Sequence, residues 1–198
     1  MLCHICDKNG VLACSVCGKT VCLEHGRFGI VCSSCMLKKE KISFSIREAL
    51  SKDRRVIGEL IRMFWGEDVQ VAFDKEFAVK DLPAYVATVG NNVVGFISYY
   101  DLEDMLIVAL GILPKYQGLG IGKALVHAVE NRARELSKRR ILVSTTNDNL
   151  LALAFYQMLG FQIYEVVPGA IAKKHGKTVL GFNNIPIRDE IRLCKILK

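Results

Sequence analysis

The sequence lacks any run of eighteen apolar residues, and it therefore predicts no transmembrane helix. It begins Met1-Leu2-Cys3-His4, without the basic start and the long apolar stretch of a cleaved signal peptide. Internal repeats and low-complexity tracts are also absent. Hydrophobic residues make up 51% and charged residues 24% of the 198 residues, the balance of an ordinary soluble globular protein. We therefore expect a cytoplasmic protein of one or two domains.

Cysteine is almost missing beyond the first 35 residues, where Cys194 stands alone as an expected small core residue. The other cysteines lie in that first segment, which in turn has few large apolar side chains. In a reducing compartment, regularly spaced pairs of such residues indicate metal ligands rather than disulfides. The candidate ligand pairs are Cys3 and Cys6, Cys14 and Cys17, Cys22 and His25, and Cys32 and Cys35.

Two residues between ligands allow both side chains to bind one ion, and tetrahedral zinc needs two such pairs. Four pairs therefore predict two structural zinc ions in a module that we place at residues 1–37. The short interval from Cys17 to Cys22 favours interleaved pairing, in which the first and third pairs share an ion; sequential pairing is the alternative. Because 35 residues bury too little apolar surface, metal binding should drive folding. The spacing resembles B-box-type and related cross-brace zinc fingers, although those usually end in a histidine pair.

An excess of acidic residues is also absent: the net charge is +7 and the isoelectric point is about 9.0. Zinc-bound thiolates would lower that charge, because metal-bound thiols are deprotonated. Basic residues within residues 1–35 are only Lys8, Lys19 and Arg27, with no recognition-helix pattern between the ligands. We therefore expect no nucleic-acid and no membrane partner, while a zinc module offers a surface on which a protein partner could dock.

From Ile42 onward the chain alternates between predicted strands and helices, and we place a second domain at residues 42–198. Antiparallel hairpins come first and helical crossovers later, which predicts a mixed α/β sheet. The expected strands are 42–46, 85–89, 93–99, 106–112, 141–145, 161–167 and 191–197, and the expected helices are 56–65, 122–137 and 149–159.

Three of these elements carry more specific expectations. The helix at 149–159 is apolar almost all round, so we expect it to be buried. The strand at 191–197 is expected at an edge of the sheet. In the helix at 122–137, His127 falls on the polar face together with Glu130, and His127 is expected in solvent.

A glycine-rich loop, Gln117-Gly118-Leu119-Gly120-Ile121-Gly122, lies between a strand and an amphipathic helix. A helix N-terminus has unpaired N–H groups and a partial positive charge, and glycines let a diphosphate approach them. The loop is not a P-loop, because Ala124 follows Lys123, and Leu125 replaces the third glycine of a dinucleotide fingerprint. It predicts an anion site, with a ligand-free glycine turn as the alternative.

The segment from Leu110 to Gly122 resembles the acyl-CoA motif of the GNAT N-acetyltransferase superfamily, whose core is [R/Q]-x-x-G-x-[G/A]. The matching positions are Gln117, Gly120 and Gly122. The stretch Asn149-x-x-Ala152-x-x-Phe155-Tyr156-x-x-Leu159-Gly160-Phe161 is similar to the second signature of that family. The resemblance covers residues 42–198, and it implies a GNAT-like acyl-CoA N-acyltransferase fold with acetyl-CoA as cofactor and a primary amine as acceptor.

The resemblance also implies roles for individual residues. Backbone N–H groups of residues 117–122 would hold the pyrophosphate, and Asn149 would bind the pantetheine arm, unless it only caps its helix. The strand residues that would pair with this arm are Leu110, Gly111 and Ile112. Tyr156 would be the general acid, since a phenol is protonated at pH 7. Residues 106–112 contain no acidic side chain that could be the general base, so a non-catalytic adaptor that only binds acyl-CoA is the alternative.

Overall fold

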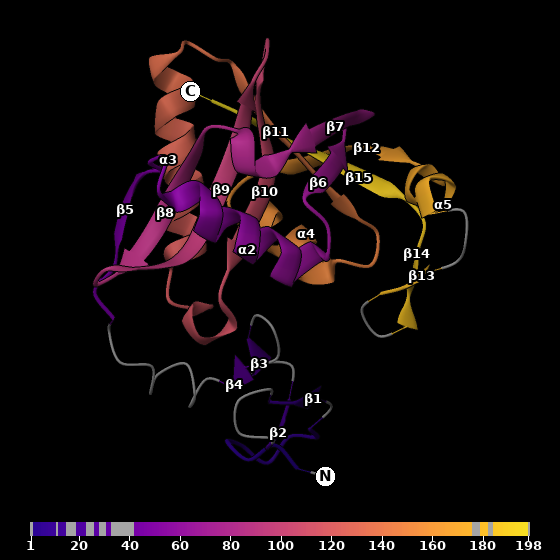
Figure 1. Cartoon of the computed structure of the whole chain (residues 1–198). Coiled ribbons are helices and arrows are strands. Elements are labelled where there is room, and N and C mark those ends of the chain that lie inside the picture. Colours follow the sequence, from indigo (N-terminus) through magenta and orange to yellow (C-terminus); the bar gives the residue numbers. More distant parts are fainter. Residues whose placement is uncertain are drawn as a thin grey trace. The chain divides into compact units, whose positions relative to one another are not determined.

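The computed structural model describes residues 2–10, 12–14, 19–22, 26–27, 31–32, 42–175, 179–181 and 184–197. Contacts between residues divide the chain into two compact units, Met1–Ser43 and Phe44–Lys198. The larger unit is built on a seven-stranded sheet with helices packed on its faces (Figure 1). Within the part of the chain that is described, no helix has the length and apolar character needed to cross a membrane.

The sheet has the strand order β12-β15-β11-β10-β9-β8-β5, and every neighbouring pair is antiparallel except β10 and β11. Its strands are β5 (Ser45–Glu48), β8 (Ala84–Val89), β9 (Asn92–Asp101), β10 (Met105–Ile112), β11 (Arg140–Thr146), β12 (Gln162–Val167) and β15 (Glu190–Ile196). The predicted mixed α/β sheet is thus confirmed. The prediction that the last strand lies at an edge was wrong, because β15 inserts between β11 and β12 and pairs with both.

The strands β10 and β11 stay together over only part of their length. Their pairing joins Met105–Ile107 to Ile141–Val143, and β10 then continues to Ile112 without a partner on that side among the described residues. The register with β9 shifts between Ile107 and Ala109, which marks a β-bulge at this point. The second half of β10 therefore offers peptide groups to a ligand that lies along it.

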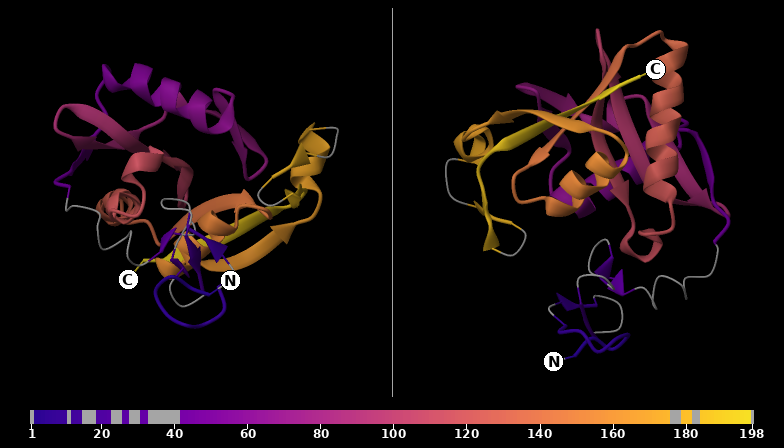
Figure 2. Two further views of the ribbon diagram at one scale, coloured as in Figure 1. Left: turned by 90° about the horizontal axis from the view of Figure 1, so that it is seen from below. Right: turned by 180° about the vertical axis from the view of Figure 1, so that it is seen from behind.

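Helices cover both faces of the sheet. Helix α3 (Ile121–Glu135) packs against Ile97 in the larger hydrophobic cluster, whereas α2 (Asp53–Trp65) packs against Phe96 in the second one. Since adjacent residues of a strand point to opposite faces, the two helices lie on opposite sides of the sheet, as Figure 2 shows. The other helices within the described residues are α4 (Leu150–Met158), α5 (Ala170–His175) and the 3-10 turns η1 (Val79–Asp81) and η2 (Pro114–Tyr116).

A short hairpin of β6 (Val69–Ala72) and β7 (Lys75–Ala78) lies on the α2 side and is absent from the sequence-based prediction. Its turn is fixed to β15: the backbone N–H of Phe73 donates to Glu190 Oε1 at 2.9 Å, and Arg192 lies 2.8 Å from a carboxylate oxygen of Asp74. Both turn residues adopt positive φ, 52° and 61°, without the glycine or asparagine that usually signals such a turn. A further small hairpin joins β13 (Val179–Leu180) to β14 (Pro186–Ile187).

Helix α4 is more exposed than predicted. Only Tyr156 is fully buried, while Leu150, Leu151 and Met158 are 45%, 42% and 65% exposed. The expectation of a buried helix was therefore wrong. The helix packs against β12, which lies at the edge of the sheet.

Glu130 is buried although it lies on the polar face of α3, whereas His127 is half exposed. Lys195 Nζ of β15 approaches Glu130 Oε1 at 2.6 Å, and His127 Nδ1 lies 2.8 Å from Oε2. Burial by itself would raise the pKa of the Glu130 carboxyl, but the hydrogen bonds with Lys195 and His127 lower it below its usual value. The periodicity of α3 could not reveal this partner, because Lys195 comes from a strand far along the chain.

We expect Lys195→Met to lower the free energy of unfolding by about 3 kcal/mol, because it leaves a buried carboxylate without its cation. Methionine keeps an unbranched stem near the Phe161 ring, over which the lysine ammonium lies at 5.8 Å. The pKa of Glu130 is lower in the folded state than in the unfolded state, so the ion pair with Lys195 contributes fully to stability when the pH is above the unfolded-state pKa. This contribution is lost as the pH falls through the folded-state pKa. The variant's deficit in urea unfolding should therefore shrink on acidification. A double variant with Glu130→Met should regain most of the loss, and a double variant as unstable as the single one would contradict the pairing.

Among its described residues, the smaller unit contains three very short antiparallel pairs. They are a bridge between Leu2 and Asn9, the pair β1 (Leu12–Ala13) with β2 (Thr20–Val21), and the pair β3 (Gly26–Arg27) with β4 (Val31–Cys32). The buried hydrophobic cluster of its described part consists of Cys3, Cys14, Val21 and Cys22.

Candidate active site and cysteine cluster

The glycine-rich loop leads from the end of β10 through η2 into α3. Gly118 and Gly120 adopt left-handed conformations, with φ of 74° and 86°, which only glycine enters without strain. Gly120 is the N-cap residue of α3, and the N–H of Ala124 donates to its carbonyl at 3.0 Å. The backbone N–H groups of residues 121–123 precede that first helical hydrogen bond, so they have no partner within the helix and point toward its N-terminal end.

Because Gly122 has no side chain, the start of α3 can pack closely between β10 and α4. A Cβ atom at this position would lie 3.1 Å from Ile112 Cδ1 and 3.2 Å from Phe155 Cζ. The loop is held to β10 as well, because Gln117 Nε2 donates to the carbonyl oxygen of Ile112 at 3.0 Å. The two signatures predicted from the sequence, 117–122 and 149–161, therefore meet at Gly122 and Phe155.

The open half of β10 is closely covered on its other face. A Cβ atom at Gly111 would lie 2.6 Å from Cε2 of Phe64, whose ring comes from α2. The glycine thus lets α2 approach the strand next to the loop, which the sequence motif alone did not reveal. Leu110 and Ile112 instead pack toward the larger core cluster, on the side of Tyr156.

Tyr156 of α4 is 6% exposed, and its ring lies between those of Phe155 and Phe161, with centroids 5.2 and 5.4 Å away. Burial raises the pKa of its phenol above the usual value, so the hydroxyl is protonated at neutral pH. This hydroxyl makes no hydrogen bond to the described residues. Among those residues, Ser98 Oγ is the only fully buried side-chain oxygen or nitrogen without a hydrogen-bond partner, so the hydroxyl oxygen of Tyr156 is not fully buried. The Tyr156 hydroxyl can therefore donate its proton to a bound molecule.

Asn149 caps α4: its Oδ1 accepts a hydrogen bond from the N–H of Ala152 at 3.1 Å. The residue is exposed, and its amide nitrogen makes no hydrogen bond within the described ranges. Capping and ligand binding, which the sequence left as two interpretations, are compatible because they use different atoms.

Within the described part of the chain, every buried carboxylate already makes a structural hydrogen bond, so none of them is an evident general base. Arg47 lies 2.6 Å from Asp53 Oδ2, and Glu130 and Glu190 are engaged as described above. Asp148 Oδ1 accepts from Thr146 Oγ1 at 2.5 Å. Each of these carboxylates already has a structural hydrogen bond, which agrees with the absence of a base from the sequence motif.

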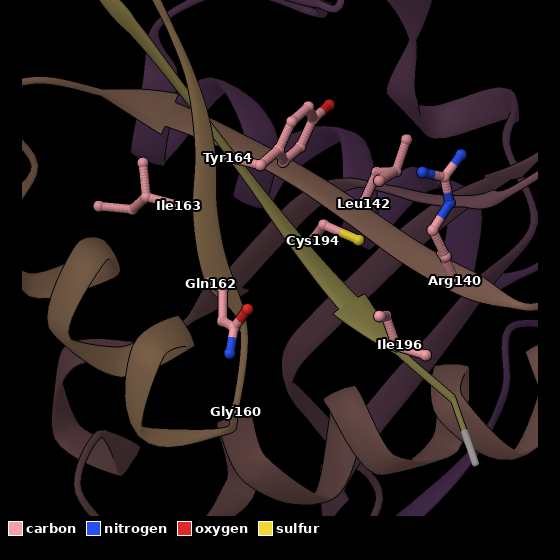
Figure 3. A pocket seen from close by; sticks show the side chains of 8 residues that line it. All are labelled: Arg140, Leu142, Gly160, Gln162, Ile163, Tyr164, Cys194 and Ile196. Atoms are coloured by element: carbon pink, nitrogen blue, oxygen red, sulfur yellow. The ribbon is translucent and has the colours of Figure 1, made fainter.

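A depression of about 540 Å³ lies apart from this site, on the outer face of β11, β12 and β15 (Figure 3). Its lining residues are Arg140, Leu142, Gly160, Gln162, Ile163, Tyr164, Cys194 and Ile196. None of them belongs to the glycine-rich loop. Cys194 lies on this face, half-buried, rather than in the core as expected, and burial raises the pKa of its thiol.

Three of the predicted metal ligands come together in the smaller unit. The sulfur atoms of Cys3, Cys6 and Cys22 all lie within 4.8 Å of one another, and those of Cys6 and Cys22 are 3.8 Å apart. A disulfide would need about 2.05 Å. Burial would raise the pKa of the Cys3 thiol, but hydrogen bonds from the backbone of Cys22, Ile5 and Cys6 lower it to about 6.

The other predicted ligands do not complete this group within the described residues. Cys14 is buried nearby in the same cluster, but its sulfur is not part of the group of three. Cys32 belongs to β4, and the remaining candidates, Cys17, His25 and Cys35, lie outside the described residues.

Comparison with known proteins identifies the family of the larger unit. Residues 46–161 match the Acetyltransferase (GNAT) family. The chain is 31% identical over 150 residues to the uncharacterized protein YdhI of Bacillus subtilis (strain 168) and 33% identical over 149 residues to the uncharacterized protein YxbD of the same strain. These matches cover 73% and 72% of this chain and 92% of each relative. This protein therefore belongs to the GNAT acetyltransferase family, as the two sequence signatures predicted.

The fold has counterparts among solved structures. One is a GNAT family acetyltransferase from Elizabethkingia anophelis with acetyl-CoA bound, which is similar with a TM-score of 0.58 and 21% identity. The likeness covers 78% of this chain and 98% of that protein. The predicted GNAT fold is thus confirmed. The family match begins at residue 46, so the unit Met1–Ser43 lies outside it.

Proposed function

We propose that this protein transfers the acetyl group of acetyl-CoA to a primary amine, by direct attack of the amine in a ternary complex. The observation that carries the proposal is the meeting of the two signatures. Gly122 at the start of α3 lies against Phe155, and the protonated, buried Tyr156 is the next residue of α4. A helix start that suits an anion and a phenol that suits proton donation therefore belong to elements that pack against each other.

The cofactor would be held mainly by backbone groups. The unpaired N–H groups at the start of α3 suit a pyrophosphate, and the left-handed glycines keep side chains away from it. The half of β10 from Leu110 to Ile112 lies beyond its pairing with β11, so an amide-containing arm can align there like an added strand. The free amide nitrogen of Asn149 would donate a hydrogen bond to the same arm.

Acetyl-CoA supplies an activated acyl group with a thiolate as leaving group. In the proposed reaction the neutral amine forms a C–N bond to the carbonyl carbon, the C–S bond breaks, and the amine's proton passes to solvent water. A backbone N–H near Leu110 stabilises the negative charge that develops on the carbonyl oxygen. The hydroxyl of Tyr156, which its raised pKa keeps protonated at neutral pH, donates its proton to the departing sulfur, and the phenolate then takes a proton back from solvent water.

The acceptor is a primary amine of a protein N-terminus, a lysine or a small molecule. The non-catalytic adaptor is not favoured, because both signatures and the proton donor are intact and together. Transfer of a labelled acetyl group from acetyl-CoA into a library of peptides and amines tests the proposal with the full chain. Incorporation above the rate without protein is expected. Binding of coenzyme A without transfer to any acceptor would favour the adaptor, and absence of binding would refute the cofactor site itself.

We also propose that the N-terminal unit, residues 1–37, carries two structural zinc ions and that the protein works in the cytoplasm. The regular ligand spacing and the three gathered thiols support the metal, and cysteine pairs at such spacing are typical of metal sites in a reducing compartment. Two filled tetrahedral sites would leave no open position for catalysis, so the unit would provide a folded surface for a protein partner.

Removal of the metal by a chelator at neutral pH should unfold the smaller unit and leave the larger one folded. The reason is that the two units have separate hydrophobic clusters, and the smaller one has little apolar surface to bury. Circular dichroism and thermal unfolding should show the main transition unchanged, with coenzyme A affinity within about twofold of the untreated protein. Loss of the main transition on chelation would contradict this independence.

A further inference from the structure

Thr146 is the last residue of β11 and lies beside the open half of β10. The last residue pair between these two parallel strands joins Ile107 to Val143. Leu110 and Thr146 each lie three residues beyond this pair, which brings them close to the same level along the sheet. Thr146 therefore stands across the gap from the backbone at which the thioester carbonyl is proposed to bind.

Thr146 faces the side of the sheet that carries α2. It pairs with Glu190 of β15, and residues directly opposite in an antiparallel pair share a face. Glu190 in turn accepts the N–H of Phe73 from hairpin β6–β7, which lies on the α2 side. Tyr156 belongs to the larger core cluster on the other face. A cofactor held by α3 and α4 leaves the α2 face to the incoming amine, so Thr146 lies on the side of the amine.

The hydroxyl proton of Thr146 is already used in a hydrogen bond. Oγ1 donates to Oδ1 of Asp148 at 2.5 Å, a length typical of a hydrogen bond to an ionised carboxylate. A hydroxyl has one proton and two lone pairs, and no residue in the described ranges donates to this oxygen. The oxygen can therefore only accept a hydrogen bond from a ligand. Such a group selects the N–H of an amine over a carbonyl or ether oxygen.

Asp148 is held in the orientation that this hydrogen bond needs. Its side chain is buried, and a Cβ atom at Gly181 of hairpin β13–β14 would lie 1.9 Å from Oδ2. The neighbouring Asn147 ties the same turn to the chain that follows the hairpin. Its Nδ2 donates to the carbonyl of Pro186 at 2.9 Å, and its Oδ1 accepts the N–H of Arg188 at 2.8 Å. The carboxylate therefore cannot turn away from Thr146 without moving the hairpin.

The burial of Asp148 acquires a purpose through Thr146. The cap of α4 is provided by Asn149, so Asp148 does not serve as the capping residue. Burial of a carboxylate is unfavourable unless other groups interact with its charge. The charge polarises the hydroxyl oxygen and strengthens any hydrogen bond that this oxygen accepts. The effect grows as an attacking nitrogen becomes positive during C–N bond formation, and an interaction that strengthens in the transition state accelerates the reaction.

We infer that Thr146 binds the amino group of the acceptor and directs its lone pair at the carbonyl carbon, with Asp148 as the residue that positions the hydroxyl. This inference rests on the proposed acetyl transfer. The nitrogen donates one N–H to Thr146 Oγ1 and forms the C–N bond with its lone pair. A primary amine has two N–H groups, so one proton passes to solvent water while the other stays on Thr146 and becomes the N–H of the amide.

The first test removes the hydroxyl by Thr146→Val, which keeps the β-branched shape of the side chain. The acceptor is the amine or peptide that reacts fastest in the labelled-acetyl library. Its kcat/KM should fall about 10–10²-fold, as expected for a hydrogen bond to a group that becomes charged. Calorimetry should show unchanged affinity for coenzyme A. Parent-like rates in this variant would overturn the inference and leave the proposed acetyl transfer in place.

Two conservative variants refine this result. Thr146→Ser keeps the hydroxyl and should retain most of the parent kcat/KM. Asp148→Asn keeps the shape of the side chain but removes its charge, so it should lower kcat/KM for the same acceptor. A serine variant as slow as the valine variant would contradict a role of the hydroxyl.

A binding measurement separates recognition of the amine from a purely structural role. The analogue of the acceptor in which a methyl group replaces the amino group cannot donate to Thr146. In the presence of coenzyme A, calorimetry should show equal affinity of this analogue for the parent protein and Thr146→Val. The acceptor itself should bind the variant more weakly. Equal weakening of both ligands would refute the inference, because it would indicate a distorted site.

Thr88→Val is the matched control for a lost side-chain hydrogen bond. Oγ1 of Thr88 lies 2.8 Å from Oγ of Ser45, between β8 and β5, and strand β9 separates this pair from β10. This variant loses a hydrogen bond of the same kind away from the gap, so its kcat/KM should equal that of the parent protein. A loss as large as in Thr146→Val would attribute both effects to the stability of the sheet and would overturn the inference.

Discussion

The variant Tyr156→Phe should turn over about 10²–10³-fold more slowly than the parent protein, with coenzyme A affinity almost unchanged. Phenylalanine keeps the ring between Phe155 and Phe161, so only the hydroxyl is lost. Without it, the thiolate leaves unprotonated, and the loss falls on the chemical step rather than on binding. Steady-state kinetics with a working acceptor, and calorimetry with coenzyme A, separate the two effects.

Tyr164→Phe is the matched control, because Tyr164 is half exposed on β12 and lines the separate depression on the outer face. Its turnover should equal that of the parent protein. The pH profile adds a second readout: burial holds the pKa of Tyr156 above its usual value, so the phenol stays protonated through neutral and mildly alkaline pH. Activity should not fall there through loss of this proton. Unchanged turnover in Tyr156→Phe would assign the general acid elsewhere.

The sequence predicted the parts of the active site whose chemistry is local. The glycine-rich loop needs residues in the left-handed conformation and a helix start, and a short stretch of consecutive residues in the sequence indicates both. The contact between Gly122 and Phe155 is not local, because it depends on how α3, β10 and α4 pack. The sequence could indicate its existence only through the resemblance of two separate signatures to one family. Neither the sequence nor the structure identifies the general base.

The errors in the predicted fold have a common physical cause. Periodicity within one segment cannot show what a distant segment brings to it. Glu130 lies on the polar face of α3 and is nevertheless buried beside Lys195 of β15, and α4 looked buried although Leu150, Leu151 and Met158 are exposed. The position of β15 inside the sheet is likewise decided by pairing with two strands that precede it in sequence. Hairpin β6–β7 was missed because its turn is held by contacts with β15 rather than by glycine.

The variant Gly120→Ala should lose about 10²-fold in coenzyme A affinity, which corresponds to about 3 kcal/mol. Gly120 has φ of 86° and open space around the place of its Cβ, so a methyl group would extend into the volume in front of the helix start. Displacing a pyrophosphate there sacrifices charge-assisted hydrogen bonds worth about 1.5–3 kcal/mol each. Calorimetric titration with coenzyme A measures the change directly.

Gly66→Ala provides the control for backbone strain. Gly66 caps the C-terminus of α2 with φ of 77°, and it also has nothing within 4 Å of the place of its Cβ. Both substitutions force alanine into the left-handed region and should destabilise the fold similarly, by about 1–2 kcal/mol. Only the Gly120 variant should lose affinity, because only its methyl group lies where an anion would meet the unpaired N–H groups of α3. Equal coenzyme A affinity in the two variants, each checked to be folded, would show that the glycine-rich loop does not bind the cofactor. The proposal that the loop positions the thioester next to Tyr156 would then be wrong.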